Sequence, residues 1–140
     1  MPLTIEHHRR QDLTVTVLVG EVDVATSAQL RESLTRLVAS GARHLILDVS
    51  AVTLIDSGGL GVLLALHHHL RDRHGPGTGP VTLTGVTPRV RDVLRVTRLT
   101  TVFPIYGSVD VAVHAHYATR TGHHAPAPLS PPYDRDLDRY

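Results

Sequence analysis

The sequence predicts a single α/β domain, in which a mixed sheet of about five strands is flanked by about four helices. The chain has 140 residues, 41% of them hydrophobic, which suffices for one core. The run from Leu45 to Val49 lacks the alternation of a half-exposed strand and is typical of a strand covered on both faces. Strand-like and helix-like segments then follow one another, and this order favours parallel pairing through right-handed crossovers.

The first two strand-like segments predict a β-hairpin. Residues 3–7 and, more strongly, residues 13–19 alternate polar and apolar side chains on either side of the polar residues 9–12. Glu21 and Asp23 end the second strand and leave two carboxylates near its tip. Acidic residues at such a tip are usually only solvated, although paired carboxylates also serve as general acids and bases.

A capping box predicts the first helix, from about residue 26 to residue 40. Thr26 would cap the first turn while the side chain of Gln29 reaches back to the cap. Gly41 stands where a glycine commonly ends a helix, because it tolerates a left-handed backbone. The buried strand is expected next, over residues 43–49.

The second helix is expected over residues 57–74, and its first turn is the most informative stretch of the chain. Asp56 and Ser57 both have side chains that cap helices by accepting hydrogen bonds from the first backbone N–H groups. The same N–H groups and the helix dipole also favour an anion, or a phosphate attached to Ser57. Gly58 and Gly59 would let another molecule approach closely. A plain cap and a modified serine are therefore alternative readings of the same residues.

Three further elements follow. A fourth strand is expected at residues 81–84. Thr87 and Pro88 predict the start of a third helix, since the missing N–H of proline costs nothing in a first turn. Residues 101–105 predict a short fifth strand, which Pro104 places at or near an edge of the sheet.

The end of the chain and one internal loop are expected to lack regular structure. Residues 75–80 predict a loop from their glycine and proline content. Ser108 can cap a last helix, and the pattern then dissolves from about Thr119. We therefore expect a domain over residues 1–118 and a flexible, proline-rich tail over residues 119–140.

Composition narrows the classes of function. A formal net charge of +1 gives no reason to expect nucleic acid or an anionic membrane as a partner. Cysteine is absent, which excludes disulfides, thiol catalysis and zinc–thiolate sites. No apolar run approaches the roughly 20 residues that span a bilayer, and the start lacks the pattern of a signal peptide. We expect a cytoplasmic protein.

Neither a metal site nor an enzyme is expected. The adjacent histidines at residues 67–69 point about 100° apart on a helix and cannot converge on one metal ion. The chain offers no cofactor fingerprint and no nucleophile elbow supporting a Ser–His–Asp arrangement. We therefore predict a binding protein that needs no cofactor.

Three motifs occur in order between about residues 3 and 118. They are Gly20-Glu21-Val22-Asp23 after a strand, Asp48-Val49-Ser50, and Leu54-Ile55-Asp56-Ser57-Gly58-Gly59-Leu60-Gly61-Val62-Leu63-Leu64. Together they resemble the STAS domain, specifically the small bacterial anti-sigma factor antagonists. The chain departs from that family's pattern at Gly58, where a second serine is usual, and at Arg98, where a glycine is usual.

The resemblance implies a binding module controlled by phosphorylation. The bare form would bind an anti-sigma factor that is also a serine kinase, and would thereby free a sigma factor. Phosphorylation of Ser57 would switch this binding off, and a phosphatase would restore it. The implied partner-binding residues are Glu21, Asp23, Asp56, Ser57, Gly58, Gly59, Leu60 and Gly61. Two alternatives stay open: a scaffold subunit of a stress-sensing assembly, and a nucleotide or small-molecule sensor that uses the anion seat at residues 56–59.

Overall fold

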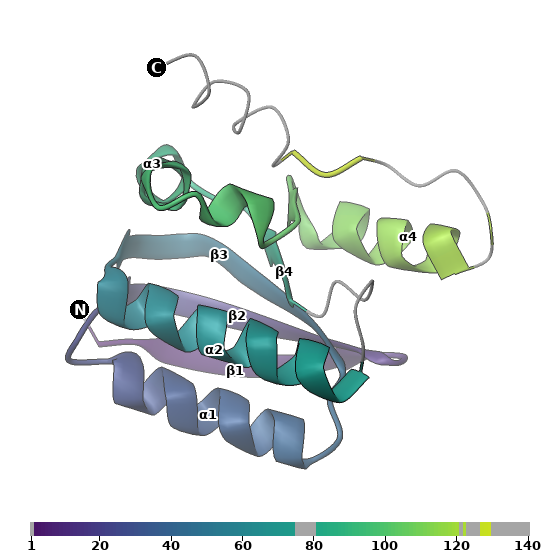
Figure 1. The fold of residues 1–140 in the computed structure, drawn as a ribbon, viewed down its shortest axis with the longest axis horizontal. Helices are drawn as coiled ribbons and strands as arrows, with labels where there is room; N and C mark the ends of the chain where they lie inside the picture. The colour runs from purple at the N-terminus through teal and green to yellow at the C-terminus, as the bar shows by residue number, and fades with distance from the viewer. Residues whose placement is uncertain (1, 75–80, 121, 123–126, 130–140) are drawn as a thin grey trace.

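The computed structural model describes residues 2–74, 81–120, 122 and 127–129 (Figure 1). The loop predicted at residues 75–80 and most of the tail predicted at residues 119–140 lie outside the described residues. The elements run in the order β1 (Thr4–Arg10), β2 (Leu13–Val22), α1 (Ser27–Ala39), β3 (His44–Ile55), α2 (Ser57–His74), β4 (Val81–Thr84), α3 (Pro88–Val96), a 3₁₀ turn (Leu99–Thr101), β5 (Ile105–Tyr106) and α4 (Val109–Arg120).

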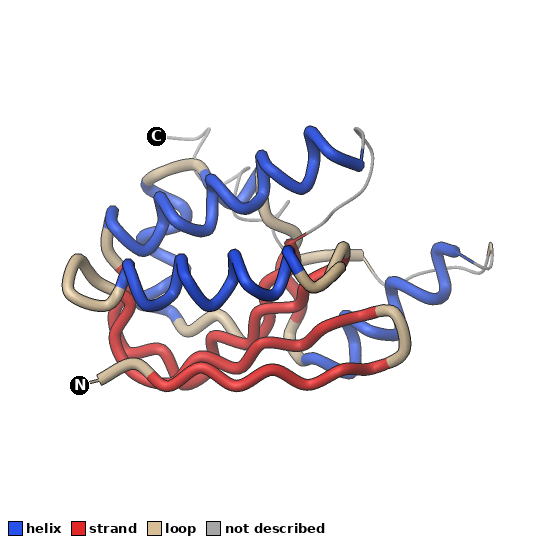
Figure 2. Tube along the Cα trace, turned by 90° about the horizontal axis from the view of Figure 1, so that it is seen from below, coloured by secondary structure: helices blue, strands red, loops and turns tan. Residues whose placement is uncertain are grey.

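The strands form one mixed sheet in the order β1-β2-β3-β4-β5, with helices covering it (Figure 2). β1 and β2 form the predicted antiparallel hairpin, and β3, β4 and β5 each join the sheet in parallel. The predicted α/β class, with five strands and four α-helices among the described residues, is therefore confirmed. β5 lies at an edge of the sheet, as Pro104 indicates.

Each face of the sheet has its own apolar layer. The larger layer lies under α1, α2 and α3, where Leu30, Leu63 and Leu94 are fully buried against the inward side chains of β3. A smaller cluster on the other face packs Ala112 of α4 against Ile46 of β3. This arrangement explains why β3 shows no alternation: both of its faces are covered.

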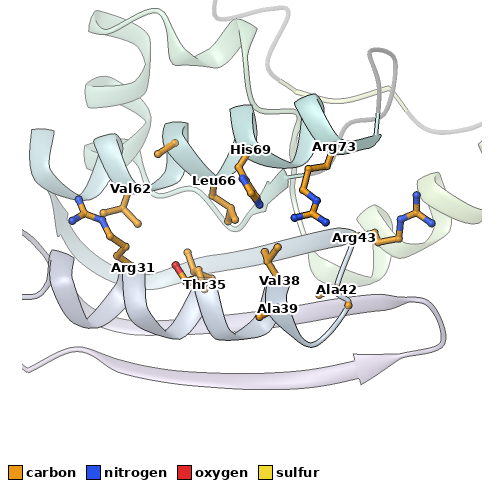
Figure 3. A pocket seen from close by; sticks show the side chains of 13 residues that line it. Arg31, Thr35, Val38, Ala39, Ala42, Arg43, Val62, Leu66, His69 and Arg73 are labelled. Atoms are coloured by element: carbon orange, nitrogen blue, oxygen red, sulfur yellow. The ribbon is translucent and has the colours of Figure 1, made fainter.

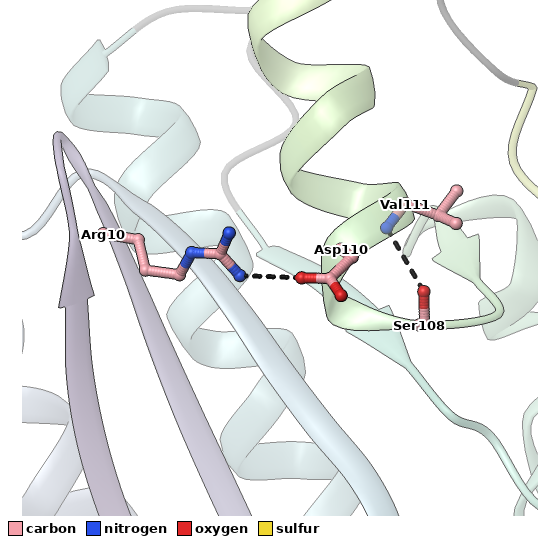
Figure 4. A network of polar contacts seen from close by, with 4 residues as sticks. All are labelled: Arg10, Ser108, Asp110 and Val111. Carbon is pink, nitrogen blue, oxygen red and sulfur yellow. Dashed lines mark hydrogen bonds and ion pairs between the residues drawn. The ribbon is translucent and has the colours of Figure 1, made fainter.

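Polar contacts hold α4 beside the hairpin (Figure 4). The Arg10 guanidinium donates to Asp110 over 3.0 Å, and the hydroxyl of Ser108 accepts from the Val111 N–H over 3.2 Å. Ser108 therefore caps α4 as expected. The helix ends at Arg120, two residues beyond the predicted end of the domain. Leu129, further along, donates its N–H to the Ile105 carbonyl beside β5.

The capping box predicted for α1 is wrong. The Thr26 hydroxyl makes no cap bond to α1 and instead donates to the Glu21 carbonyl over 2.8 Å. The Gln29 side chain does not reach back to Thr26; its amide donates to the Leu3 carbonyl over 2.9 Å. Both groups are used by tertiary contacts, which a local pattern does not reveal.

Strand boundaries also differ from expectation, and β1 continues to Arg10, three residues beyond its predicted end at residue 7. β3 continues to Ile55, six residues beyond the predicted end at residue 49. β5 begins at Ile105, because Leu99–Thr101 form a 3₁₀ turn where the fifth strand was expected to start. By contrast, β4 and the start of α3 are confirmed, and Thr87 caps α3 by accepting from the Val90 N–H.

Candidate functional site

The first turn of α2 is built around the carboxylate of Asp56. Its Oδ1 accepts from the N–H groups of Gly58 and Gly59, over 2.9 and 3.2 Å. Its Oδ2 accepts from the N–H of Val24, in the loop after β2, over 3.2 Å. Asp56 is therefore the helix cap, and the same side chain ties α2 to the neighbouring loop.

The anion seat expected at residues 56–59 is consequently occupied by the protein itself. The two N–H groups that an incoming anion would use already bind the carboxylate of Asp56, whose charge also compensates the positive end of the helix dipole. The expectation of an open seat for a ligand anion is corrected by this contact. The nucleotide-sensing alternative, which depended on that seat, loses its structural basis.

Ser57 stands apart from this capping arrangement. It is the first residue of α2 and is exposed to solvent. Within the part of the chain that the structure describes, its hydroxyl makes no hydrogen bond. The two roles predicted for this turn therefore belong to different residues. Asp56 caps the helix, and the Ser57 oxygen is available to another molecule.

The three glycines of this turn differ in their surroundings. A Cβ atom on Gly59 would overlap the side chain of Val22, so glycine is needed there for α2 to lie against β2. A Cβ on Gly58 would lie 3.2 Å from the Asp56 carboxylate, a tight but adjustable contact. A Cβ on Gly61 would meet nothing within 4 Å. Packing thus explains Gly59 but does not explain Gly61.

The loop between β2 and α1 is closed by a reciprocal pair of hydrogen bonds. The Asp23 N–H donates to the Thr26 hydroxyl over 3.0 Å, and the Thr26 N–H donates to the Asp23 carboxylate over 3.1 Å. The Asp23 carboxylate is therefore a structural part of the loop and is only half exposed. This loop holds Val24 at the surface, with 74% of the residue exposed, next to Gly58.

The predicted site residues therefore fall into two groups. Asp23, Asp56, Ser57 and Gly58 gather where the β2–α1 loop meets the first turn of α2, with exposed Gly61 one turn further along that helix. Glu21 is half-buried in β2, opposite Leu54.

Two of the predicted partner-binding residues do not reach the surface. Leu60 is only 5% exposed and belongs to the core. Gly59 is buried against β2. Leu60 and Gly59 position the turn by packing beneath it, and their contact with a partner stays a prediction.

Val24 was not singled out from the sequence. Its one signal is an apolar side chain in an otherwise polar segment between a strand and a helix. Together with Ser57, Gly58 and Gly61 it forms what we call the α2 tip surface, defined by these four residues.

The described residues contain no set of three or more His, Cys, Asp or Glu side chains able to hold a metal ion. In the same residues, no helix has the length and apolar character needed to cross a membrane.

Comparison with known proteins adds independent evidence. The family model of the STAS domain matches residues 4–112. BtrV of Bordetella bronchiseptica, named as a candidate anti-sigma factor antagonist, is 30% identical over 115 residues, which cover 82% of this chain and 94% of BtrV.

Solved structures agree with this match. An anti-sigma factor antagonist from Mycobacterium paratuberculosis superposes with a TM-score of 0.68 at 25% identity, covering 79% of this chain and 91% of its own. The anti-sigma factor antagonist SpoIIAA, in its unphosphorylated form, gives a TM-score of 0.66 at 21% identity, covering 87% of this chain and 98% of its own. The phosphorylated form of SpoIIAA, from Bacillus, gives a TM-score of 0.60 at 20% identity, covering 79% of this chain and 96% of its own. The SpoIIAA likeness bears on the fold alone.

Proposed function

This chain belongs to the STAS domain family, and from that premise we propose that it is an anti-sigma factor antagonist controlled by phosphorylation of Ser57. The bare form binds an anti-sigma factor that is also a serine kinase, and so frees a sigma factor. The phosphorylated form no longer binds, and a phosphatase restores it. The chain acts as a binding protein in the cytoplasm and catalyses no reaction of its own.

The exposed Ser57 hydroxyl is the observation that carries this proposal. A kinase must bring its nucleotide within bonding distance of the oxygen, which requires an accessible side chain that the fold does not need. Ser57 meets both conditions, because it is exposed and because Asp56 supplies the cap in its place. A serine that capped the helix would lose that bond on modification.

The switch follows from the charges already present around the α2 tip surface. A phosphate adds a charge of about −1.5 to −2. The N–H groups of Gly58 and Gly59, which would otherwise compensate this charge, already bind Asp56. The phosphate would therefore stand close to the Asp56 carboxylate, with these two N–H groups already taken. Burying it in an interface would cost binding free energy through desolvation and repulsion.

The interface itself would be formed by contacts that the phosphate displaces. Gly61 has open space around it, so a partner's side chain can reach the backbone of α2. Val24 offers an apolar contact on the adjoining loop. Both contacts lie beside Ser57, where a bulky modified side chain would hinder them.

Two variants of Ser57 test the proposal. Ser57→Ala should bind the anti-sigma factor and accept no phosphate at this turn, whereas Ser57→Asp should fold normally and fail to bind. Ser40→Asp is the matched control, because it adds the same charge at the end of α1 that lies away from the first turn of α2. The measurements are calorimetric binding to the kinase, and mass spectrometry of the chain after incubation with kinase and ATP. Equal binding by Ser57→Asp and Ser57→Ala would refute the switch.

A further inference from the structure

A groove separates α1 from α2 and extends from Val62, next to Gly61, to Arg73 near the other end of α2 (Figure 3). Its volume is about 800 Å³, which lies within the range of small-molecule sites. Aliphatic side chains line it from both helices, namely Leu34 and Val38 from α1 and Val62 and Leu66 from α2. Leu34 and Leu66 are buried, so the apolar floor is continuous with the core.

The rim of this groove is cationic. Arg31, Arg43, His69 and Arg73 line it, whereas the described lining contains neither Asp nor Glu. Within the described part of the chain, Arg31 and Arg73 take part in no ion pair and no hydrogen bond. Figure 3 shows His69 and Arg73 reaching from α2 into the space between the helices. Cationic side chains above an apolar floor, with no acidic side chain in the described lining, are complementary to a ligand that is both apolar and anionic.

We propose that this groove binds a carboxylate with a long aliphatic chain, that is, a fatty acid. The chain lies along Leu66, Leu34 and Val62, and burying its methylene groups there supplies most of the binding free energy. The carboxylate lies between His69 and Arg73, where a guanidinium donates two parallel hydrogen bonds to it. Apart from His69 the described lining holds no ring on which a nucleobase could stack, which favours an aliphatic ligand.

The groove is distinct from the site proposed for phosphorylation. Ser57 and Arg73 are near opposite ends of α2, whose 18 residues extend over about 27 Å at 1.5 Å per residue. Loss of fatty-acid binding would therefore leave the anti-sigma factor proposal untouched, and the reverse also holds.

Titration with dodecanoate, below its critical micelle concentration, tests this site. Calorimetry on the full chain should show one molecule bound, and amide NMR shifts should change along the groove residues of α1 and α2 and not at Val24, Ser57 and Gly58. Dodecyltrimethylammonium has the same chain with the opposite charge and should not bind. Equal binding of this cation, or shifts confined to other elements, would overturn the proposal.

Variants of the groove make the test specific. Arg73→Gln should weaken dodecanoate binding about tenfold, because it removes the charged hydrogen-bond donor. Arg71→Gln, the same change on the same helix outside the groove, should leave binding unchanged. Ala65→Glu places an acidic side chain in the groove from an exposed position and should abolish binding without unfolding the chain. Equal losses in Arg71→Gln and Arg73→Gln would show a general charge effect and would overturn the site.

Discussion

The carboxylate of Asp56 serves three backbone N–H groups at once, those of Val24, Gly58 and Gly59. Asp56→Ala removes both acceptor oxygens, and with them all three hydrogen bonds, and should lower the free energy of unfolding by about 2 kcal/mol, at the upper end for a helix cap. Asp56→Asn keeps one acceptor oxygen and should lower the free energy of unfolding by clearly less than Asp56→Ala does. Urea denaturation of the two variants measures the difference, and equal losses would show that the negative charge matters more than the hydrogen bonds.

Two glycines in the same turn should respond in opposite directions to one added methyl group. Gly61→Ala should raise the free energy of unfolding by up to about 1 kcal/mol, because its Cβ meets nothing and alanine favours the helix. Gly59→Ala should lower it, because its Cβ overlaps Val22.

Binding distinguishes packing from partner contact at these positions. If the partner approaches the backbone at Gly61, the more stable Gly61→Ala should bind the anti-sigma factor more weakly. A variant that is stabilised and binds as tightly as the parent chain would place the interface elsewhere.

The sequence predicted this turn correctly but could not assign the roles within it. Asp56 and Ser57 are both good caps, and the local pattern does not choose between them. The choice is made by the Val24 N–H, which lies 32 residues away in sequence and binds the second oxygen of Asp56. Gln29 is a similar case, since its amide donates to Leu3 across 26 residues. Long-range contacts of this kind are invisible in a short motif.

Arg98 links α3 to the following 3₁₀ turn in a left-handed backbone conformation, with φ of 62°. A side chain there costs roughly 1 kcal/mol, which glycine avoids. Arg98→Gly should therefore stabilise the chain by up to about 1 kcal/mol, less the entropy that glycine loses on folding. Arg95→Gly, inside α3, should destabilise it by about 1 kcal/mol. Thermal unfolding of both variants shows whether each change raises or lowers stability. A loss of stability in Arg98→Gly would show that the exposed arginine contributes contacts of its own.

The sequence also placed the start of β5 too early, because a short motif does not show how its residues pack in the fold. The residues from Thr101 to Phe103 suggested an extended strand, yet Thr101 belongs to the 3₁₀ turn that follows α3, and Phe103 is fully buried before β5 begins. Burial alone explains the apolar side chain of Phe103, and a run this short does not reveal whether the backbone is extended. β4 was predicted correctly because its four residues are flanked by clear turn signals in the sequence.

Burial lowers the pKa of two histidines, so the stability of the chain should depend on pH. On the larger side, His67 of α2 is only 6% exposed and its ring lies 5.6 Å from that of Phe103. Its Nδ1 has no hydrogen-bond partner among the described residues. Burial lowers the pKa of His67 below its usual 6.5, and the neighbouring His68 and Arg71 lower it further. On the hairpin, burial lowers the pKa of His7 in the same direction.

A histidine whose pKa falls on folding binds fewer protons in the folded chain than in the unfolded one. Stability should therefore be greatest above pH 6.5 and should fall as the pH drops through 6.5, until the folded protein also takes up the proton. His67→Leu removes the titrating group and the unpaired Nδ1 while keeping an apolar side chain against Phe103. It should be more stable than the parent chain at pH 5.5, and the difference should shrink at pH 7.5.

Urea denaturation of both proteins at the two pH values measures this effect. His7→Gln provides the comparison, because it removes the second histidine with a lowered pKa from a different part of the sheet. The two histidines lie on separate elements, α2 and β1, so the double variant should show the sum of the two changes. If His67→Leu loses as much stability on acidification as the parent chain, folding does not lower the pKa of His67, and its ring takes up a proton as readily in the folded protein as in the unfolded chain. Such a result would require water or another polar group to reach it beside Phe103.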